Sequence, residues 1–386
     1  MARSKSASKV DSAESEIPTN GSKDSNSLEE VQPEWWHGAV GNLLFAISWL
    51  AAPGMFGAAI VVMAVRLGSV YGTISLLLCL SIILCKTNVQ RAVVCVALAF
   101  LSMTSGSRIA LCATMVITAL IALLAVRVDP WPEVLDFFTR RWPAAAYYKK
   151  CELRGALTSI RQEKSVLAFH PHGILCCGYS MNGPWSPHFL EHCGKVTFLI
   201  DGNLRYNNPF FKLLLDWYKH PLRDFKDPSK ETIKELMVAG GNIVIVAGGF
   251  MEATLFRYGH DRVAVKKRKG LVKLCLQHGY WLHPVYSFGE SETFYAFQGL
   301  TWLRLLLAKY NIPTVIFTGC WWCPMMPFPS AELITYVGEP VKLPHIPEPD
   351  AADVDRWHDE YVKALVRLFE ENKAAAGKPD AKLEVF

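Results

Sequence analysis

The stretch Ser165–Gly173, SVLAFHPHG, joins a short apolar run to two histidines, a proline and a glycine. Ser165 to Phe169 has the composition of a buried β-strand. His170 then lies where that strand ends, and in open α/β sheets ligands bind beyond the carboxyl ends of the strands. Pro171 restricts His170 to an extended backbone, and Gly173 lets the chain turn close to a ligand. The stretch therefore predicts a strand that delivers polar side chains to a ligand crevice.

The rest of residues 165–386 alternates between strand-like and helix-like segments. Further β-rich runs are Val196–Ile200, Ile243–Val246, Trp281–Tyr286, Thr314–Phe317 and Leu333–Val337. Helical patterns occupy Pro228–Ala239, Gly270–His278, Trp302–Tyr310 and Asp355–Lys373. This alternation predicts a single α/β domain at 165–386, with a mainly parallel sheet covered by helices.

The two histidines are open to three interpretations: a general base, a metal-binding pair, or a turn with polar side chains. Histidine titrates near neutrality, so His170 or His172 is a candidate base for removing a proton from a hydroxyl. Zinc and iron sites need further ligands, and the sequence has no second His/Asp/Glu cluster of recognisable spacing. We therefore expect no metal.

A second candidate element is the run Ile243–Ala253, in which a buried strand ends in Gly248 and Gly249 and a carboxylate follows at Glu252. Two glycines permit a close backbone approach and leave N–H groups free to face a developing oxyanion. Glu252 has the chemistry to orient an imidazole and to stabilise its protonated form. The alternative is a glutamate that only favours the start of a helix.

Four consecutive cations, Lys266, Lys267, Arg268 and Lys269, precede the helical pattern that begins at Gly270. Cations oppose the dipole at a helix N-terminus, so a bound anion such as phosphate would relieve the arrangement. The alternative is a charge run that faces water or lipid headgroups.

The excess of apolar residues lies in four runs: Ala39–Val65, Leu67–Cys85, Ala92–Ser107 and Ile109–Val126. A bilayer core takes about 20 helical residues, so residues 35–127 predict a transmembrane helical region with two to four spans. Most Lys and Arg residues fall on the side of the chain's two ends, which predicts that both ends, and the α/β domain, lie in the cytosol.

Two segments flank this region. Residues 1–34 are rich in Ser and mixed charge, which predicts a disordered polar tail. Residues 128–164 mix aromatic and cationic side chains, which suits the headgroup layer, and an ordinary linker is the alternative.

The 11 cysteines follow no disulfide framework, and Cys320-x-x-Cys323 supplies only half a zinc site.

Four motifs carry a family resemblance: His170-Pro171-His172-Gly173, Gly248 to Glu252, Arg268 to Leu274, and Pro284 to Glu290. Val337-Gly338-Glu339-Pro340 and the segment from His358 to Lys373 also look similar. In order and spacing they resemble the type-2 diacylglycerol acyltransferase family, which includes monoacylglycerol and wax-alcohol acyltransferases. The resemblance runs from about Val128 to Lys373.

The resemblance implies a glycerolipid acyltransferase-like fold and acyl-CoA-dependent esterification of diacylglycerol to triacylglycerol. It implies a multi-pass protein of the endoplasmic reticulum membrane, with lipid droplets as a second location. Acyl-CoA is a co-substrate, held by Lys266 to Lys269, and no cofactor or nucleic acid is expected. The partners are acyl-CoA, diacylglycerol and membrane lipid, and a homo-oligomer is left open.

The resemblance also suggests site roles. His170, His172 and Glu252 lie in the matching catalytic positions. We predict His172 as the base, because it adjoins Gly173 and the start of a helix, with His170 as a supporting donor. N–H groups of Gly173, Gly248 and Gly249 would face the oxyanion.

The chain departs from the family pattern at Arg141-Trp142-Pro143, Leu271, His283 and Gly319 to Pro324. These departures bear on acyl-chain and acceptor preference more than on reaction type. A monoacylglycerol or fatty-alcohol acyltransferase is therefore one alternative. A non-enzymatic membrane scaffold or lipid-droplet protein is the alternative from a different class.

Overall fold

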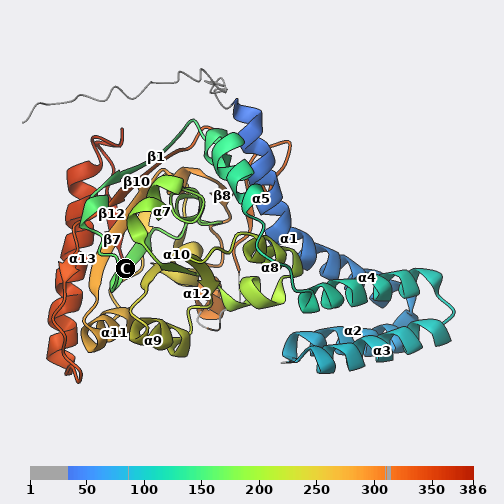
Figure 1. The fold of residues 1–386 in the computed structure, drawn as a ribbon. Helices are drawn as coiled ribbons and strands as arrows, with labels where there is room; N and C mark the ends of the chain where they lie inside the picture. Colours follow the sequence, from blue (N-terminus) through green and yellow to red (C-terminus); the bar gives the residue numbers. More distant parts are fainter. Residues whose placement is uncertain (1–33, 86, 309, 311–313) are drawn as a thin grey trace, which may run out of the picture. The chain divides into compact units, whose positions relative to one another are not determined.

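The computed structural model of the chain describes residues 34–85, 87–308, 310 and 314–386; residues 1–33 of the predicted tail and Lys86 lie outside the described residues. Within the described part, eight strands form one sheet in the order β1-β10-β7-β2-β5-β3-β4, with β11 beside β7 (Figure 1). The strands are β1 (Lys150–Gly155), β2 (Ser165–His170), β3 (Val196–Leu199), β4 (Arg223–Lys226), β5 (Asn242–Val246), β7 (Trp281–Phe288), β10 (Glu332–Val337) and β11 (Val341–Lys342). Two short pairs, β6 (Asp261–Val263) with β12 (Leu383–Val385) and β8 (Tyr295–Ala296) with β9 (Phe317–Thr318), lie outside this sheet.

The strand directions confirm the predicted α/β fold as a mixed, mostly parallel sheet. β2 is parallel to β5 and β7, β3 is parallel to β4 and β5, and β1 is parallel to β10. Only β10 and β11 run antiparallel, both against β7. Two details differ from the sequence analysis. β1 falls within residues 128–164, which were assigned to a linker, and the predicted strand Thr314–Phe317 contributes only Phe317 to the separate strand β9.

Helices cover both faces of the sheet. The α-helices of the described part, including α2 to α4 that lie away from the sheet, are α1 (Trp35–Arg66), α2 (Gly68–Leu84), α3 (Asn88–Thr104), α4 (Arg108–Ala125), α5 (Pro132–Asp136), α6 (Cys177–Asn182), α7 (Pro187–Cys193), α8 (Pro209–Trp217), α9 (Lys230–Val238), α10 (Gly249–Leu255), α11 (Gly270–His278), α12 (Thr301–Ala308) and α13 (Ala351–Asn372). Leu167 and Phe169 of β2 enter a core with α1, α6, α7 and α8. Val166 and Ala168 enter a second core with α9, α11 and α13. Successive side chains of a strand point to opposite faces, so the apolar run SVLAF contributes side chains to both cores.

The first half of α1 is part of the α/β domain. Gly38 lies so close to the main chain of Tyr147 that a Cβ atom there would overlap it. The buried Asn42 donates to the carbonyl of Ala144 at 2.6 Å and accepts from the Tyr148 hydroxyl at 3.1 Å. A single helix of 32 residues, about 48 Å long, thus begins inside the domain and continues into the apolar bundle described next.

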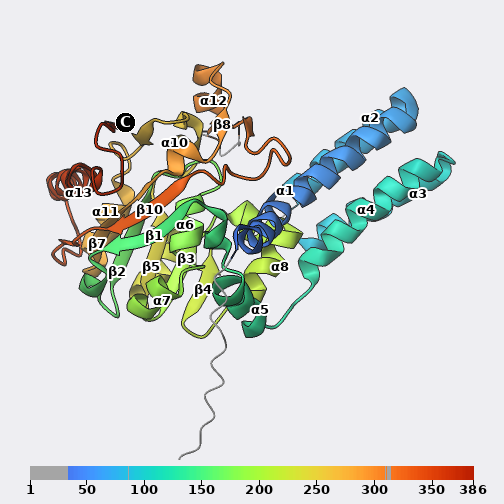
Figure 2. The same cartoon turned by 90° about the horizontal axis from the view of Figure 1, so that it is seen from above.

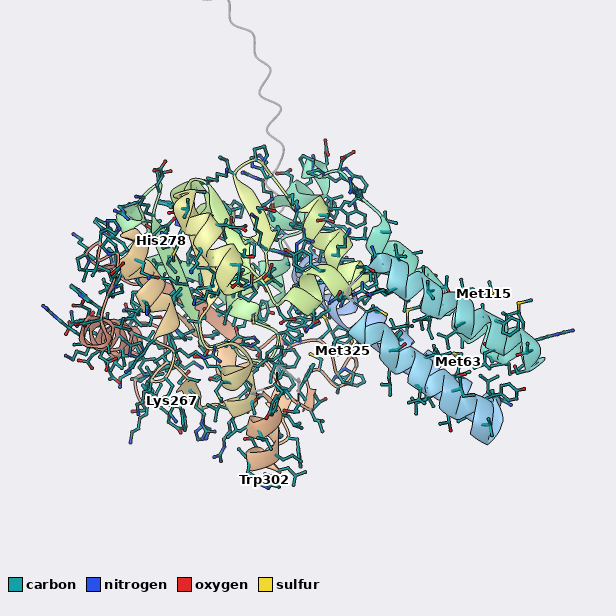
Figure 3. All side chains as sticks on the ribbon, turned by 90° about the horizontal axis from the view of Figure 1, so that it is seen from below. Met63, Met115, Lys267, His278, Trp302 and Met325 are labelled. Carbon is teal, nitrogen blue, oxygen red and sulfur yellow. The ribbon has the colours of Figure 1, made fainter. Side chains whose placement is uncertain are left out.

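The second half of α1 forms a separate cluster with α2, α3 and α4 (Figure 2). Met63 is buried between these helices, whereas Met115 stands on the outer side of α4 (Figure 3). Inside the cluster the hydroxyls of Ser102 and Thr114 lie 2.9 Å apart. By length and composition α1 and α4 could each cross a membrane, and α2 and α3 are shorter. The outer face of the cluster exposes many large apolar side chains, among them Val61, Leu77, Val93 and Phe100.

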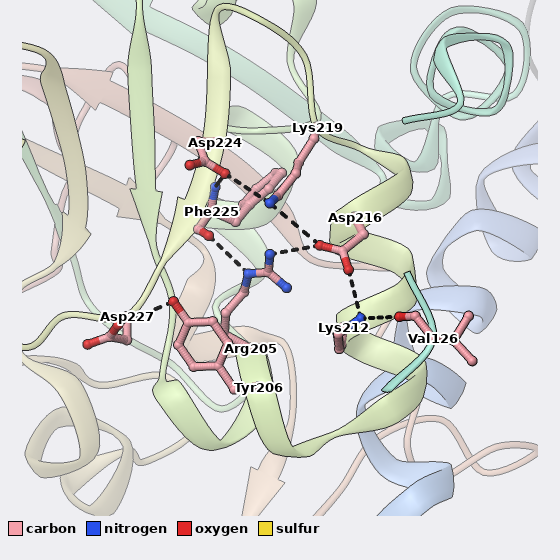
Figure 4. Close-up of polar contacts among 9 residues, drawn as sticks. All are labelled: Val126, Arg205, Tyr206, Lys212, Asp216, Lys219, Asp224, Phe225 and Asp227. Carbon is pink, nitrogen blue, oxygen red and sulfur yellow. Dashed lines mark hydrogen bonds and ion pairs between the residues drawn. The ribbon is translucent and has the colours of Figure 1, made fainter. Parts of the chain in front are cut away.

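A polar network joins the end of α4 to the α/β domain (Figure 4). Lys212 of α8 donates to the carbonyl of Val126 at 2.7 Å and pairs with Asp216 at 3.0 Å. Asp216 also pairs with the buried Arg205 at 2.7 Å. Burial raises the pKa of Asp216, but the two cations outweigh it and hold the pKa below its ordinary value. The helical bundle is therefore fixed to the domain at both ends of residues 35–126.

Candidate active site

His170 is the last residue of β2 and its side chain is fully buried. Its Nδ1 lies 2.8 Å from Oε1 of Glu252, and its Nε2 lies 2.9 Å from the hydroxyl of Tyr361 on α13. A carboxylate only accepts hydrogen bonds, so Nδ1 donates to Glu252, and the Tyr361 hydroxyl is the partner of Nε2. Burial raises the pKa of Tyr361, so the hydroxyl keeps its own proton. Both ring nitrogens of His170 are therefore occupied.

His172 has one free ring nitrogen. Its Nδ1 lies 3.1 Å from the carbonyl of Gly173, which only accepts, so this nitrogen carries the proton. Cys176 lies 3.4 Å from the same nitrogen. No hydrogen bond within the described residues reaches Nε2. Burial lowers the pKa of His172, against smaller opposing effects of Gly173 and Glu252, so the ring is neutral at pH 7. Its Nε2 is thus an unprotonated, unoccupied base.

Glu252 ties the two histidines together. It stands in the first turn of α10 and is buried. Besides His170, it accepts the N–H groups of His172 at 2.8 Å and of Ala264 at 2.9 Å. Burial raises its pKa, but the His170 ring and the two N–H donors outweigh burial and hold the pKa below its ordinary value. The sequence analysis expected Glu252 to orient an imidazole, and the structure shows contacts with the His170 ring and the His172 main chain.

Three backbone N–H groups near the histidines are free. No hydrogen bond within the described residues uses the N–H of Gly173, Gly248 or Gly249. Gly173 and Gly249 have φ of +62° and +52°, which glycine adopts without strain. A side chain at Gly248 would overlap the carboxylate of Glu252, and one at Gly173 would overlap Glu290. Glycine at these positions therefore lets two buried carboxylates approach the loop.

Glu290 is a site residue to which sequence reasoning assigned no role. It is fully buried and accepts the N–H groups of Cys177 at 3.1 Å and Gly178 at 2.6 Å. Burial raises its pKa to about 7, although the two donors act in the opposite direction. Its signal in the sequence was Gly289-Glu290 directly after the apolar strand β7, because a charged residue there is close to the ends of the neighbouring parallel strands. Tyr361 lies within the predicted helix Asp355–Lys373, to which the sequence analysis assigned no residue of the site.

A cavity of about 550 Å³ lies on the sheet face that carries α9, α11 and α13. Tyr361, the partner of His170, forms part of its wall. Of the four predicted cations, only Arg268 lines it, and the Arg268 guanidinium also lies near Gly249. Lys266 and Lys267 are exposed and do not line the cavity, and Figure 3 labels Lys267. Lys269 pairs with Asp355 at 2.6 Å. The structure thus brings one of the four cations to the site.

Across the described residues, no group of three or more His, Cys, Asp and Glu side chains could hold a metal ion. Cys320 lies 3.3 Å from the Tyr147 hydroxyl and 3.1 Å from the carbonyl of Pro327, so it belongs to the packing of that loop.

Comparison with known proteins gives this site a context. The family model described as diacylglycerol acyltransferase matches residues 133–386, which include every site residue named above. The chain belongs to the diacylglycerol acyltransferase family. Diacylglycerol O-acyltransferase 2 of Homo sapiens is 28% identical over 271 residues, covering 64% of this chain and 67% of the relative. Diacylglycerol O-acyltransferase 2 of Xenopus laevis is 29% identical over 273 residues, covering 64% and 73%. Diacylglycerol O-acyltransferase 2-like protein 6 of Mus musculus is 33% identical over 231 residues, covering 55% and 67%. No solved structure matches the chain.

The family match begins at residue 133, after helices α1 to α4. The diacylglycerol acyltransferase domain therefore consists of the sheet and the helices that cover it. The first half of α1 is docked onto this domain although it lies outside the matched range.

Proposed function

We propose that this member of the diacylglycerol acyltransferase family transfers an acyl group from acyl-CoA to the free hydroxyl of diacylglycerol, which yields triacylglycerol and coenzyme A. The observation that carries the proposal is the neutral ring of His172 with its free Nε2, on a residue whose main chain is held by the buried Glu252–His170 pair. A base that deprotonates a hydroxyl at neutral pH needs this protonation state. Acyl-CoA acts as co-substrate, and the reaction needs no cofactor.

In the proposed reaction, Nε2 of His172 accepts the proton of the diacylglycerol hydroxyl while the oxygen attacks the thioester carbonyl. The carbon–sulfur bond then breaks, and the coenzyme A thiolate takes the proton back from the imidazolium. One ester bond forms and one thioester bond is lost, so atoms and charges balance without an acyl-enzyme. His172 ends the cycle in its starting state.

The tetrahedral intermediate carries a negative oxygen that needs hydrogen-bond donors. The free N–H groups of Gly173, Gly248 and Gly249 supply them in this proposal. Preorganised donors of this kind contribute about 2.7–4 kcal/mol each to the lowering of the barrier. Arg268, near Gly249, adds positive charge on the same side.

The Glu252–His170 pair supports the base without touching the substrate. Glu252 holds the main chain of His172 in place and supplies a negative charge that stabilises the imidazolium. His170 keeps one oxygen of Glu252 oriented through Nδ1. This assignment retains His172 as the base and makes His170 a supporting donor, as the sequence analysis expected.

We further propose that α1 to α4 insert into the endoplasmic reticulum membrane, with the α/β domain in the cytosol and lipid droplets as a second location. The exposed apolar face of the bundle supports insertion, because such surfaces are rare on soluble proteins. The buried Ser102–Thr114 contact is of the type that joins helices in lipid. α2 and α3 have 17 residues each, which is at the lower limit for a span, so both two and four crossings fit.

The test is an assay of microsomes that carry the chain, with labelled acyl-CoA and a panel of diacylglycerol, monoacylglycerol and fatty alcohol. We expect triacylglycerol as the main product, and at least about a 1,000-fold loss of it in His172→Ala, because both base catalysis and proton return are lost. Expression and membrane insertion serve as controls for folding. Retained activity in His172→Ala would reject this base, and no product from any acceptor would favour the scaffold alternative.

A further inference from the structure

The cavity on the α9–α11–α13 side of the sheet combines an apolar interior with a basic rim. Its apolar wall comes from the sheet and the covering helices and includes Ile233, Ile245, Val272, Leu274 and Leu282. At about 550 Å³ it has the size of a small-molecule site. A ligand that fits it has an apolar or weakly polar body and an anionic end.

The rim carries four cations that have no carboxylate partner. Lys230 and Lys234 come from α9, Arg268 from the loop before α11, and Lys273 from α11. None of the four forms an ion pair with a described residue, whereas Lys269, one residue beyond Arg268, pairs with Asp355. Four like charges around one opening repel each other, and a multiply charged anion would relieve this repulsion.

Two helices also begin at this rim. Pro228 and Lys230 mark the start of α9, and Gly270 and Leu271 mark the start of α11. No side chain caps the first turn of α11, so its backbone N–H groups remain available. Free N–H groups together with the positive ends of two helix dipoles favour phosphate.

Two residues of the cavity wall connect it to the candidate site. Tyr361 lines the cavity and bonds to Nε2 of His170 at 2.9 Å. Arg268 lines it as well and lies near Gly249, one of the proposed oxyanion donors. A ligand with its anionic end at the lysines of the rim thus has room for its opposite end beside Tyr361 and Arg268.

We propose that this cavity binds the coenzyme A part of acyl-CoA, with its phosphates at Lys230, Lys234 and Lys273 and its thioester end toward Arg268 and Tyr361. This inference rests on the proposed function for the identity of the ligand. It places the polar co-substrate on the sheet face opposite the core that contains α1 and α8. Of the sequence-predicted run Lys266–Lys269, it retains Arg268 alone.

The experiment compares two double variants of the full-length chain in detergent micelles. Lys230→Ala with Lys234→Ala removes two charges from the rim, and Lys266→Ala with Lys267→Ala removes two charges from exposed positions outside the cavity. We expect the rim variant to raise the KM for acyl-CoA at least about tenfold, because phosphate contacts of lysine are charge-assisted. The KM for diacylglycerol and kcat should stay within about twofold in both variants, since neither pair contacts the reacting atoms.

Replacing Lys230 and Lys234 by arginine keeps the charge and should restore most of the acyl-CoA affinity. The proposal would be overturned if the two alanine variants raised the KM for acyl-CoA equally. It would also be overturned if the rim variant raised the KM for diacylglycerol more than the KM for acyl-CoA.

A binding measurement separates this inference from the proposed function. Coenzyme A and 3′-dephospho-coenzyme A are titrated onto the same proteins without an acceptor, so the result does not depend on turnover. Weaker coenzyme A binding in the rim variant alone supports the subsite even if the chain transfers no acyl group. Unchanged binding in the rim variant of an active enzyme refutes the subsite and leaves the proposed reaction standing.

Discussion

Glu252→Gln tests whether the buried carboxylate organises the site. The substitution keeps the shape of the side chain and removes its charge. Glu252 accepts from His170 Nδ1 and the Ala264 N–H through one oxygen, and from the His172 N–H through the other. Glutamine has one accepting oxygen and one donating NH2 group. In either orientation of the amide, one of the two backbone N–H groups faces a donor and loses its acceptor.

The expected losses follow from these contacts. A hydrogen bond to a charged group contributes about 1.5–3 kcal/mol, and an unsatisfied buried N–H costs about 1–3 kcal/mol. We therefore expect Glu252→Gln to lower the free energy of unfolding by about 3–5 kcal/mol, which a domain of about 5–15 kcal/mol can survive. Since the carboxylate contacts the main chain of His172 and not its ring, the expected loss in kcat is about 100–1,000-fold, or about 2.7–4 kcal/mol.

The assay measures triacylglycerol formation from labelled acyl-CoA at pH 7, together with thermal unfolding of the same protein. The pKa of Glu252 is held below its ordinary value of 4.5, so its contribution to stability is present above this pH and is lost as the pH falls. Glu360→Gln, at an exposed position on α13, is the matched control and should leave kcat and stability nearly unchanged. A folded Glu252→Gln protein with kcat within about threefold of wild type would refute the reasoning.

Three further predictions concern residues around the site. Tyr361→Phe keeps the packing but leaves Nε2 of His170 without its partner, so kcat should fall about tenfold with an unchanged KM for diacylglycerol; a change in KM alone would contradict this. Burial raises the pKa of Glu290 from 4.5 to about 7, so its contribution to stability is full below pH 4.5 and about 3 kcal/mol of it is lost as the pH rises through 7. In Glu290→Gln this pH dependence should vanish from thermal unfolding measured between pH 5 and 8. The same pH dependence in the variant and the wild type would reject the prediction. Asn42→Leu leaves the Ala144 carbonyl and the Tyr148 hydroxyl unpaired, and should destabilise the protein by about 2–4 kcal/mol and expose the first half of α1 to protease; resistance equal to wild type would disprove the docking.

The central strands were predictable from sequence, and the edge strands were not. β2 and β5 are continuous apolar runs because both of their faces are buried. β1 (KCELRG) and β4 (RDFK) lie at the two edges of the sheet, where their charged side chains other than Arg223 remain partly exposed, so their composition carries no strand signal. The apolar run Thr314–Phe317 was wrongly predicted as a strand of this sheet: Val315 and Phe317 are partly buried against the core, but the run adds nothing to the main sheet.

The grouping of His170, His172 and Glu252 could be predicted because they follow two neighbouring parallel strands, β2 and β5. Which ring meets the carboxylate depends on the backbone between His170 and Gly173, and a sequence does not specify this detail. The residues of the cationic cavity rim were harder to predict from the sequence. A run of four adjacent cations is conspicuous, but the cavity rim collects Lys230 and Lys273 from two helices more than 40 residues apart.

Hydropathy also treats α1 as one apolar segment, although its two halves have different surroundings. The first half packs Phe45 and Ala46 into the domain core, and small residues such as Gly38 and Gly41 allow that close contact. The second half packs Ala59 and Met63 against α2 to α4. A membrane span and a domain helix are both apolar, and glycines occur in both halves of α1, so Asn42 is the polar residue that marks the docked half in the sequence.

This division of α1 has a consequence for the proposed reaction. The catalytic end of β2 lies between two cores, one shared with α1 and the other lined by the cavity with the cationic rim. Diacylglycerol dissolves in lipid and coenzyme A dissolves in water, so the two substrates must reach His172 from environments of opposite polarity. A rigid connection between α1 and the domain would hold the base at a fixed distance from the bilayer, with the coenzyme A cavity turned toward the cytosol. Loosening that connection through Asn42→Leu should therefore raise the KM for membrane-borne diacylglycerol more than the KM for acyl-CoA, and an equal rise in both would show that α1 serves only as an anchor.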